Sequence, residues 1–115
     1  MSEYLAPLKD IRFVMQDLAG LDQIASLPGF EEATPDVVDA ILDEAAKFAG
    51  GILSPLNQAG DQDGARWKDT VVTTTPGFKE AYRQFVDNGW NALGCDPEFG
   101  GQGLPRLLAT AVSEM

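Results

Sequence analysis

The stretch that decides the fold is residues 34–56, which read TPDVVDAILDEAAKFAGGILSPL. Thr34 can cap the first free amides of a helix, Pro35 fits the first helical position, and Asp36 complements the helix dipole. Apolar side chains then recur every three or four residues over about five turns. A stripe this wide predicts the central helix of a bundle; it consists of Val38, Ile41, Leu42, Ala45, Phe48, Ala49, Ile52, Leu53 and Leu56.

Two features of this stretch weaken a regular helix. Gly50-Gly51 has low helix propensity, and Pro55 cannot donate a backbone hydrogen bond. Close packing by a neighbouring segment, or a kink, would account for them. The following residues, 57–64, contain Gly60-Asp61-Gln62-Asp63-Gly64 and predict a loop.

Helical periodicity recurs on both sides of the central stretch. Residues 7–19 carry apolar side chains on one helix face, and Gly20 is a suitable stop. Thr75-Pro76 repeats the helix start seen at position 34 and precedes an amphipathic segment that ends before Gly89. Pro105 opens a last helix. Residues 66–74 are β-branched and predict a short strand pair or an ordered loop.

These elements predict an all-α fold, an antiparallel helical bundle with an extra N-terminal helix and a glycine-rich connector. We expect an N-terminal extension with one helix over residues 1–33, and a helical domain over residues 34–115. The last helix, which contains Leu107, Leu108, Ala111 and Val112, carries no glycine or proline stop before Met115. The sequence therefore predicts that this domain is truncated in its last helix.

Composition excludes several function classes. The net charge of −10 argues against nucleic acid, because a phosphate backbone must be met by clustered Lys and Arg. The absence of histidine rules out Ser-His pairs, Cys-His pairs and histidine-ligated metal within these residues. A single cysteine, Cys95, excludes an internal disulfide and is expected to be a small buried apolar residue. No apolar run reaches the roughly 18 residues of a membrane span, and no signal peptide is recognisable, so we expect a cytoplasmic protein.

The glycine-rich connector, residues 89–104, allows two interpretations. Gly100-Gly101-Gln102-Gly103 precedes a helix and could cradle a phosphate, but no strand leads into it and no nucleotide-loop ending follows. The alternative is a tight turn whose glycines adopt positive φ or admit a neighbouring segment. Asp96 and Glu98 could be an acid/base pair or solvated loop carboxylates. Trp90 and Phe99 could line a ligand pocket, although packing over the end of the core is favoured.

Three stretches of the chain together resemble the acyl-CoA dehydrogenase family. The first is similar to the glycine-rich segment of that family's N-terminal helical domain and comprises Gly89-Trp90, Leu93, Pro97-Glu98-Phe99-Gly100-Gly101, Gly103-Leu104-Pro105 and Glu114. Residues 4–14, YLAPLKDIRFV, resemble the extra N-terminal segment of a long subgroup that includes the 3-methylmercaptopropionyl-CoA dehydrogenase type. Residues 52–57, ILSPLN, with Gly60-Asp61, fit the second-helix pattern of this subgroup. The resemblance spans nearly the whole chain.

The resemblance implies a flavoenzyme that oxidises an acyl-CoA thioester to its trans-2-enoyl form. In such enzymes a glutamate removes the α-proton while the β-hydrogen leaves as hydride to FAD. Both the flavin and the base belong to later domains, so no catalytic, cofactor-binding or metal residue is expected here, and Glu114 is not given the base role. The resemblance further implies an acyl-CoA substrate, an electron-transfer acceptor and a homo-oligomer for the full-length protein.

The N-terminal helices of this family form one wall of the acyl pocket. By resemblance, the pocket-facing candidates are Phe99, Gly100, Gly101, Leu104, Leu108 and Ala111, with core packing as the alternative for each. The expected function is that of an N-terminal module, inactive alone and without bound FAD. The competing hypothesis is a stand-alone acidic helical protein-interaction module without catalysis.

Overall fold

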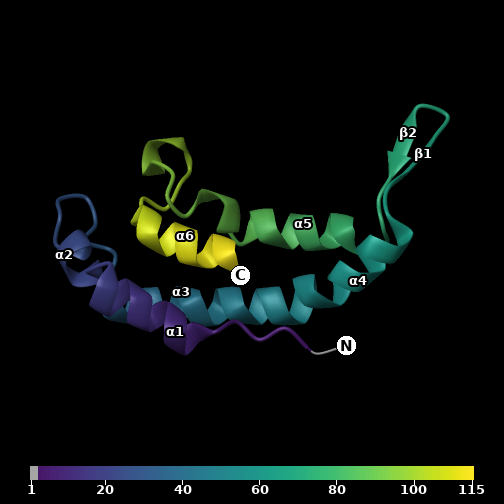
Figure 1. Ribbon diagram of the computed structural model, residues 1–115. Coiled ribbons are helices and arrows are strands. Elements are labelled where there is room, and N and C mark those ends of the chain that lie inside the picture. The colour runs from purple at the N-terminus through teal and green to yellow at the C-terminus, as the bar shows by residue number, and fades with distance from the viewer. Residues whose placement is uncertain (1–2) are drawn as a thin grey trace.

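A nearly unbroken helical rod from Pro35 to Asp63 forms the spine of the molecule in the computed structural model, which describes residues 3–115 (Figure 1). It consists of α3 (Pro35–Phe48), a π-helical turn η2 (Ala49–Leu53) and α4 (Ser54–Asp63). The predicted start is confirmed, because the Thr34 hydroxyl accepts a hydrogen bond from the Val37 amide at 3.3 Å. Gly50 lies in the π turn, where a Cβ atom would come within 3.1 Å of the Tyr4 carbonyl oxygen. The predicted close packing by a neighbour is therefore that of the N-terminal arm.

The predicted loop over residues 57–64 is wrong, since α4 continues as a helix to Asp63. The helix ends at Gly64, whose φ of 66° is left-handed. Packing explains the difference: a Cβ on Gly60 would lie 2.5 Å from the Phe78 ring, so the glycine leaves room for that ring. This tertiary contact outweighs the cost of about 1 kcal/mol that glycine brings to a helix.

The N-terminal segment runs antiparallel to α3 and packs on it (Figure 1). Its helix is formed by α1 (Leu8–Phe13) and a second π turn, η1 (Val14–Leu18), and stops at Gly20 as predicted. A second short helix, α2 (Leu21–Ala25), follows where the sequence predicted only one helix before residue 34. Its first residue, Leu21, is buried in the hydrophobic core.

One core joins the N-terminal segment to the rest of the chain. The buried residues of this core are Ile11, Met15, Leu21, Ala33, Val38, Leu42, Leu93, Leu104, Leu108 and Ala111. They come from both sides of position 34, so residues 3–33 contribute to the same hydrophobic core as the helical domain. The division at residues 33 and 34 stays a prediction.

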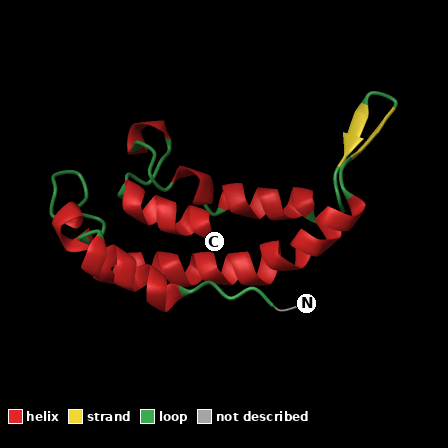
Figure 2. Cartoon of the chain, in the orientation of Figure 1, coloured by secondary structure: helices red, strands yellow, loops and turns green. Residues whose placement is uncertain are grey.

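A β-hairpin leaves the body of the molecule after α4 (Figure 2). Strands β1 (Arg66–Lys68) and β2 (Val71–Thr73) are antiparallel, and Trp67 stands opposite Val72. All six strand residues are exposed. The strand pair predicted over residues 66–74 is thus confirmed, and the remainder of the fold is all-α, as predicted.

The second layer consists of α5 (Phe78–Asp87) and α6 (Arg106–Glu114), which lie over the spine (Figure 1). Thr75 is no helix cap: it is buried, and its hydroxyl donates to the Gly64 carbonyl at 3.4 Å. The helix instead follows Gly77, whose φ is 96°. Helix α5 ends before Gly89, which adopts the predicted left-handed conformation with a φ of 75°. The connector to α6 contains the 3₁₀ turns η3 (Trp90–Ala92) and η4 (Pro97–Phe99).

The two layers form a thin slab with extents of 53 × 36 × 18 Å. Its radius of gyration is 16.6 Å, whereas a compact domain of this length has about 13 Å. The accessible surface is 8103 Å², about 2,000 Å² more than a folded monomer of this mass exposes. Much of the excess is apolar, since exposed large side chains include Leu5, Phe13, Leu18, Trp67, Tyr82 and Phe99. The slab therefore leaves extended helix faces open.

Candidate functional site

The glycine-rich connector is held by its own backbone. Five consecutive amides, those of residues 100–104, donate to carbonyl oxygens within the same segment at 2.9–3.1 Å. The acceptors are Pro97, Asp96, Ala92, Cys95 and Leu93, in that order. Because a phosphate cradle needs free amides, the structure supports the tight-turn interpretation over the phosphate-loop interpretation.

The glycines are explained by this turn. Gly100 and Gly103 have φ values of 86° and 63°, which favour glycine. Gly101 is required for a different reason, since a Cβ there would lie 2.1 Å from the Cys95 carbonyl oxygen. The Gln102 side chain donates to the Gly89 carbonyl at 3.2 Å and so ties the turn to the end of α5.

The six predicted pocket residues lie in different environments. Phe99, 83% exposed, and Gly100 lie at the surface of the connector, and Gly101 is partly covered. Leu104 and Leu108 are buried in the core, and Leu108 has no exposed surface. Ala111 is in the core too, and it lines a groove of about 330 Å³ between α1 and α6. Their role in an acyl pocket stays a prediction.

Burial or packing over the end of the core was expected for Cys95, Trp90 and Phe99, and only Trp90 meets this expectation. Cys95 is exposed, which corrects the expected burial: the tight turn keeps it at the surface while its backbone packs against Gly101. Trp90 covers the core end as expected and packs against Phe48 with ring centroids 6.4 Å apart. Phe99 does not, because the 3₁₀ turn η4 carries it away from the core.

The connector carboxylates lie at the surface. Asp96 and Glu98 are both exposed, and the Asp96 carboxylate accepts a hydrogen bond from the Glu98 amide at 2.9 Å. This bond caps the turn η4, so Asp96 has a structural role in the connector.

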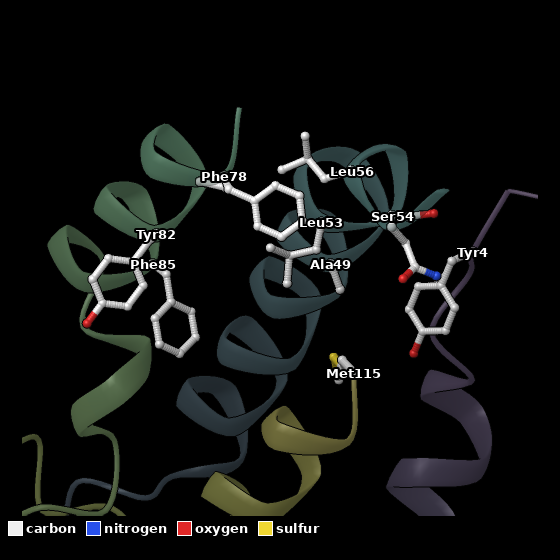
Figure 3. Close-up of a pocket in the computed structure, with 11 residues that line it drawn as sticks. Tyr4, Ala49, Leu53, Ser54, Leu56, Phe78, Tyr82, Phe85 and Met115 are labelled. Carbon is white, nitrogen blue, oxygen red and sulfur yellow. The ribbon is translucent and has the colours of Figure 1, made fainter. Parts of the chain in front are cut away.

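A largely apolar groove lies away from the connector, and the sequence did not reveal it. It has a volume of about 620 Å³ and lies between α4, α5 and the N-terminal arm (Figure 3). Its lining residues are Tyr4, Ala49, Leu53, Ser54, Leu56, Asn57, Phe78, Ala81, Tyr82, Phe85 and Met115. The apolar spacing of α5 was recognisable in the sequence. The spacing did not show that Phe78 and Tyr82 on this apolar face would stay partly or largely exposed in the fold. We call this space the α4–α5 groove.

The charged groups with shifted pKa values lie outside the connector and the α4–α5 groove. Arg12 donates to Asp39 at 2.9 Å and to Asp43 at 2.7 Å, and these two bonds raise the pKa of its guanidinium. The Gly29 amide donates to the Glu31 carboxylate at 3.1 Å, and this bond lowers the pKa of Glu31. Within residues 3–115, no cluster of three metal-ligating side chains occurs, and no helix is long and apolar enough to cross a membrane.

Comparison with known proteins identifies relatives along nearly the whole chain. It is 38% identical over 112 residues to 3-methylmercaptopropionyl-CoA dehydrogenase of Ruegeria pomeroyi, covering 97% of this chain. It is 24% identical over 116 residues to the broad-specificity linear acyl-CoA dehydrogenase FadE5 of Mycobacterium tuberculosis, covering 99% of this chain. No family model matches. The chain spans about a fifth of the length of these relatives, 19% of each. Over nearly its whole length, the chain is therefore homologous to part of the acyl-CoA dehydrogenases, the family that its sequence predicted.

Proposed function

We propose that this chain is the N-terminal helical part of a flavin-dependent acyl-CoA dehydrogenase and forms one wall of its acyl pocket. The observation that carries the proposal is the match of 97% of this chain to only 19% of the Ruegeria pomeroyi relative. The open slab agrees with it, because a wall exposes apolar faces when the domains that it contacts are absent. The substrate is an acyl-CoA thioester, and the residues proposed to face its acyl chain are Phe99, Gly100 and Gly101 of the connector, with Ala111 of α6 beside the groove between α1 and α6.

The flavin is proposed to bind elsewhere in the longer protein. When bound, FAD accepts the hydride from the β-carbon of the acyl group. The connector offers the FAD pyrophosphate no free glycine amides, because those of Gly100, Gly101 and Gly103 already donate to backbone carbonyls. Arg106 at the start of α6 is exposed and stands apart from other basic residues in the sequence. What this chain contributes is an apolar surface that excludes water from the reacting thioester.

Further parts of the proposal concern the whole protein. An electron-transfer acceptor reoxidises the flavin, and the enzyme is a homo-oligomer. The proposed location is the cytoplasm, since the exposed free thiol of Cys95 fits a reducing compartment.

A chimera tests the proposed function. This chain replaces the matching segment of the Ruegeria pomeroyi relative, and the chimera is assayed with an acyl-CoA substrate and an artificial electron acceptor. We expect bound flavin and turnover, because the replaced segment supplies the same wall. A control chimera carries an unrelated helical segment of equal length and should be inactive. A folded, flavin-loaded chimera without turnover would count against the proposal.

The chain alone provides the second arm of the test. Mixed with acyl-CoA and the same acceptor, it should show no turnover and no bound flavin. Stoichiometric FAD on the isolated chain would contradict the assignment of the flavin to other domains. Size-exclusion at two concentrations separates this proposal from that of a stand-alone module: the open apolar faces predict self-association, whereas a module complete in itself stays monomeric.

A further inference from the structure

We propose that an apolar α-helix of the longer protein lies in the α4–α5 groove, in line with α6. This inference rests on the proposed function, since it needs the longer protein. Four segments surround the groove: the spine, α5, the N-terminal arm and the end of α6 (Figure 3). In Figure 1 helix α6 runs toward the space between α5 and the spine, and the side chain of Met115 already lines it.

The lining suits a packed helix. Ala49 and Ala81 are buried and small, so they let another helix approach to the usual 8–10 Å between axes. Larger apolar side chains stand beside them and stay partly or largely exposed: Leu53 at 39%, Phe78 at 40% and Tyr82 at 69%. Helix α5 contacts the spine through Phe85, whose ring centroid lies 6.3 Å from that of Phe48. Phe78 and Tyr82 of the same helix line the open groove.

The mostly apolar, uncharged lining of the groove favours an apolar occupant. The only polar side-chain groups in the lining are the Tyr4 and Tyr82 hydroxyls, Ser54 and Asn57, and no charged residue contributes. A helix satisfies its own backbone hydrogen bonds, so it can fill an uncharged groove with apolar side chains and leave no polar group unpaired. A second copy of this acidic chain in this groove would bring a net charge of −10 toward another of the same charge, so the self-association expected of the isolated chain is assigned to its other open apolar faces.

Thiol protection at position 53 tests the inference. Leu53→Cys is made in a Cys95→Ser background, both in the 115-residue chain and in the chimera described above. Labelling by a thiol reagent is followed by peptide mass spectrometry at position 53, which separates this site from cysteines of the relative. We expect rapid labelling in the chain alone and at least tenfold slower labelling in the chimera. Ser26→Cys, in the turn after α2, serves as the matched control and should label rapidly in the chain alone.

Three arms identify the occupant. A proline placed one turn beyond Met115 in the chimera should restore labelling at position 53, because it breaks the helix. Protection of the isolated chain by octanoyl-CoA would instead identify an acyl chain as occupant and overturn the inference. Protection that rises with the concentration of the isolated chain would identify a second copy and overturn it too.

The outcome is independent of turnover. An active chimera that still labels rapidly at position 53 overturns this inference and leaves the proposed function standing. An inactive chimera counts against the proposed function, and its labelling at position 53 still decides whether a helix occupies the groove.

Discussion

The substitution Gly101→Ala should be among the most damaging small changes in the connector. The new Cβ would lie 2.1 Å from the Cys95 carbonyl oxygen and 2.3 Å from its carbon, and both are backbone atoms that no rotamer change can move. Two backbone segments must therefore separate until the contact reaches at least 3.0 Å. The Gly101 amide bond to Asp96 and the Gly103 amide bond to Cys95 lie directly across this gap, at 3.0 and 2.9 Å.

The expected loss follows from those bonds. Each of the two hydrogen bonds contributes about 1 kcal/mol net, and overpacking costs about 1–3 kcal/mol, so the free energy of unfolding should fall by about 3–5 kcal/mol. In a domain near this size the melting temperature should drop by about 10 °C or more. Urea unfolding followed by circular dichroism measures the loss.

A matched glycine provides the control. Gly51 lies in the π turn η2, and a Cβ there meets nothing within 4 Å. Gly51→Ala should leave stability unchanged or raise it by up to about 1 kcal/mol, because alanine has the higher helix propensity. Equal urea midpoints for the two variants would refute the close-approach explanation of Gly101.

Two further predictions concern charged groups. Arg12→Ala should lower the free energy of unfolding by about 0.5–1 kcal/mol, because the ion pairs to Asp39 and Asp43 are partly exposed; the difference from wild type should shrink in 1 M salt, and an unchanged difference would show that packing dominates. Glu31 should titrate below the ordinary glutamate pKa of 4.5, since the Gly29 amide stabilises its carboxylate. Its contribution to stability is present above pH 4.5 and is lost as the pH falls through the lowered pKa. Carboxyl NMR titration measures this, and a Glu31 pKa at or above 4.5 would contradict the hydrogen bond.

The sequence predicted those elements whose signals are local. The Thr34 cap, the stops at Gly20 and Gly89 and the strand pair near Trp67 each depend on a few neighbouring residues, and all are found where expected. The loop predicted around Gly60 failed because a distant residue, Phe78, decides its conformation. A glycine that makes room for a ring cannot be told from a glycine that ends a helix by sequence spacing alone.

The candidate site shows the same limit. The resemblance pointed to the connector, but it did not predict that the amides of residues 100–104 donate to backbone carbonyls, since this depends on bonds between residues up to eleven apart. The exposure of Cys95 was missed because an average tendency to burial says nothing of one tight turn. The α4–α5 groove was missed because it is made jointly by four segments, of which the sequence showed only separate apolar faces.

The π turn at Ala49–Leu53 has a consequence for the insertions and deletions that the spine can tolerate. A π turn holds more residues than an α turn, so deleting one residue there can restore a plain α-helix without breaking the chain. Because the wider turn takes up the extra residue, α4 would keep about its present orientation relative to α3 after such a deletion, and Gly60 would stay beneath Phe78. A deletion in a regular part of the rod would instead rotate α4 by about 100° and bring a bulkier face to the ring. The π turn is therefore the position in this rod at which one residue can be lost with the least disturbance of its packing faces.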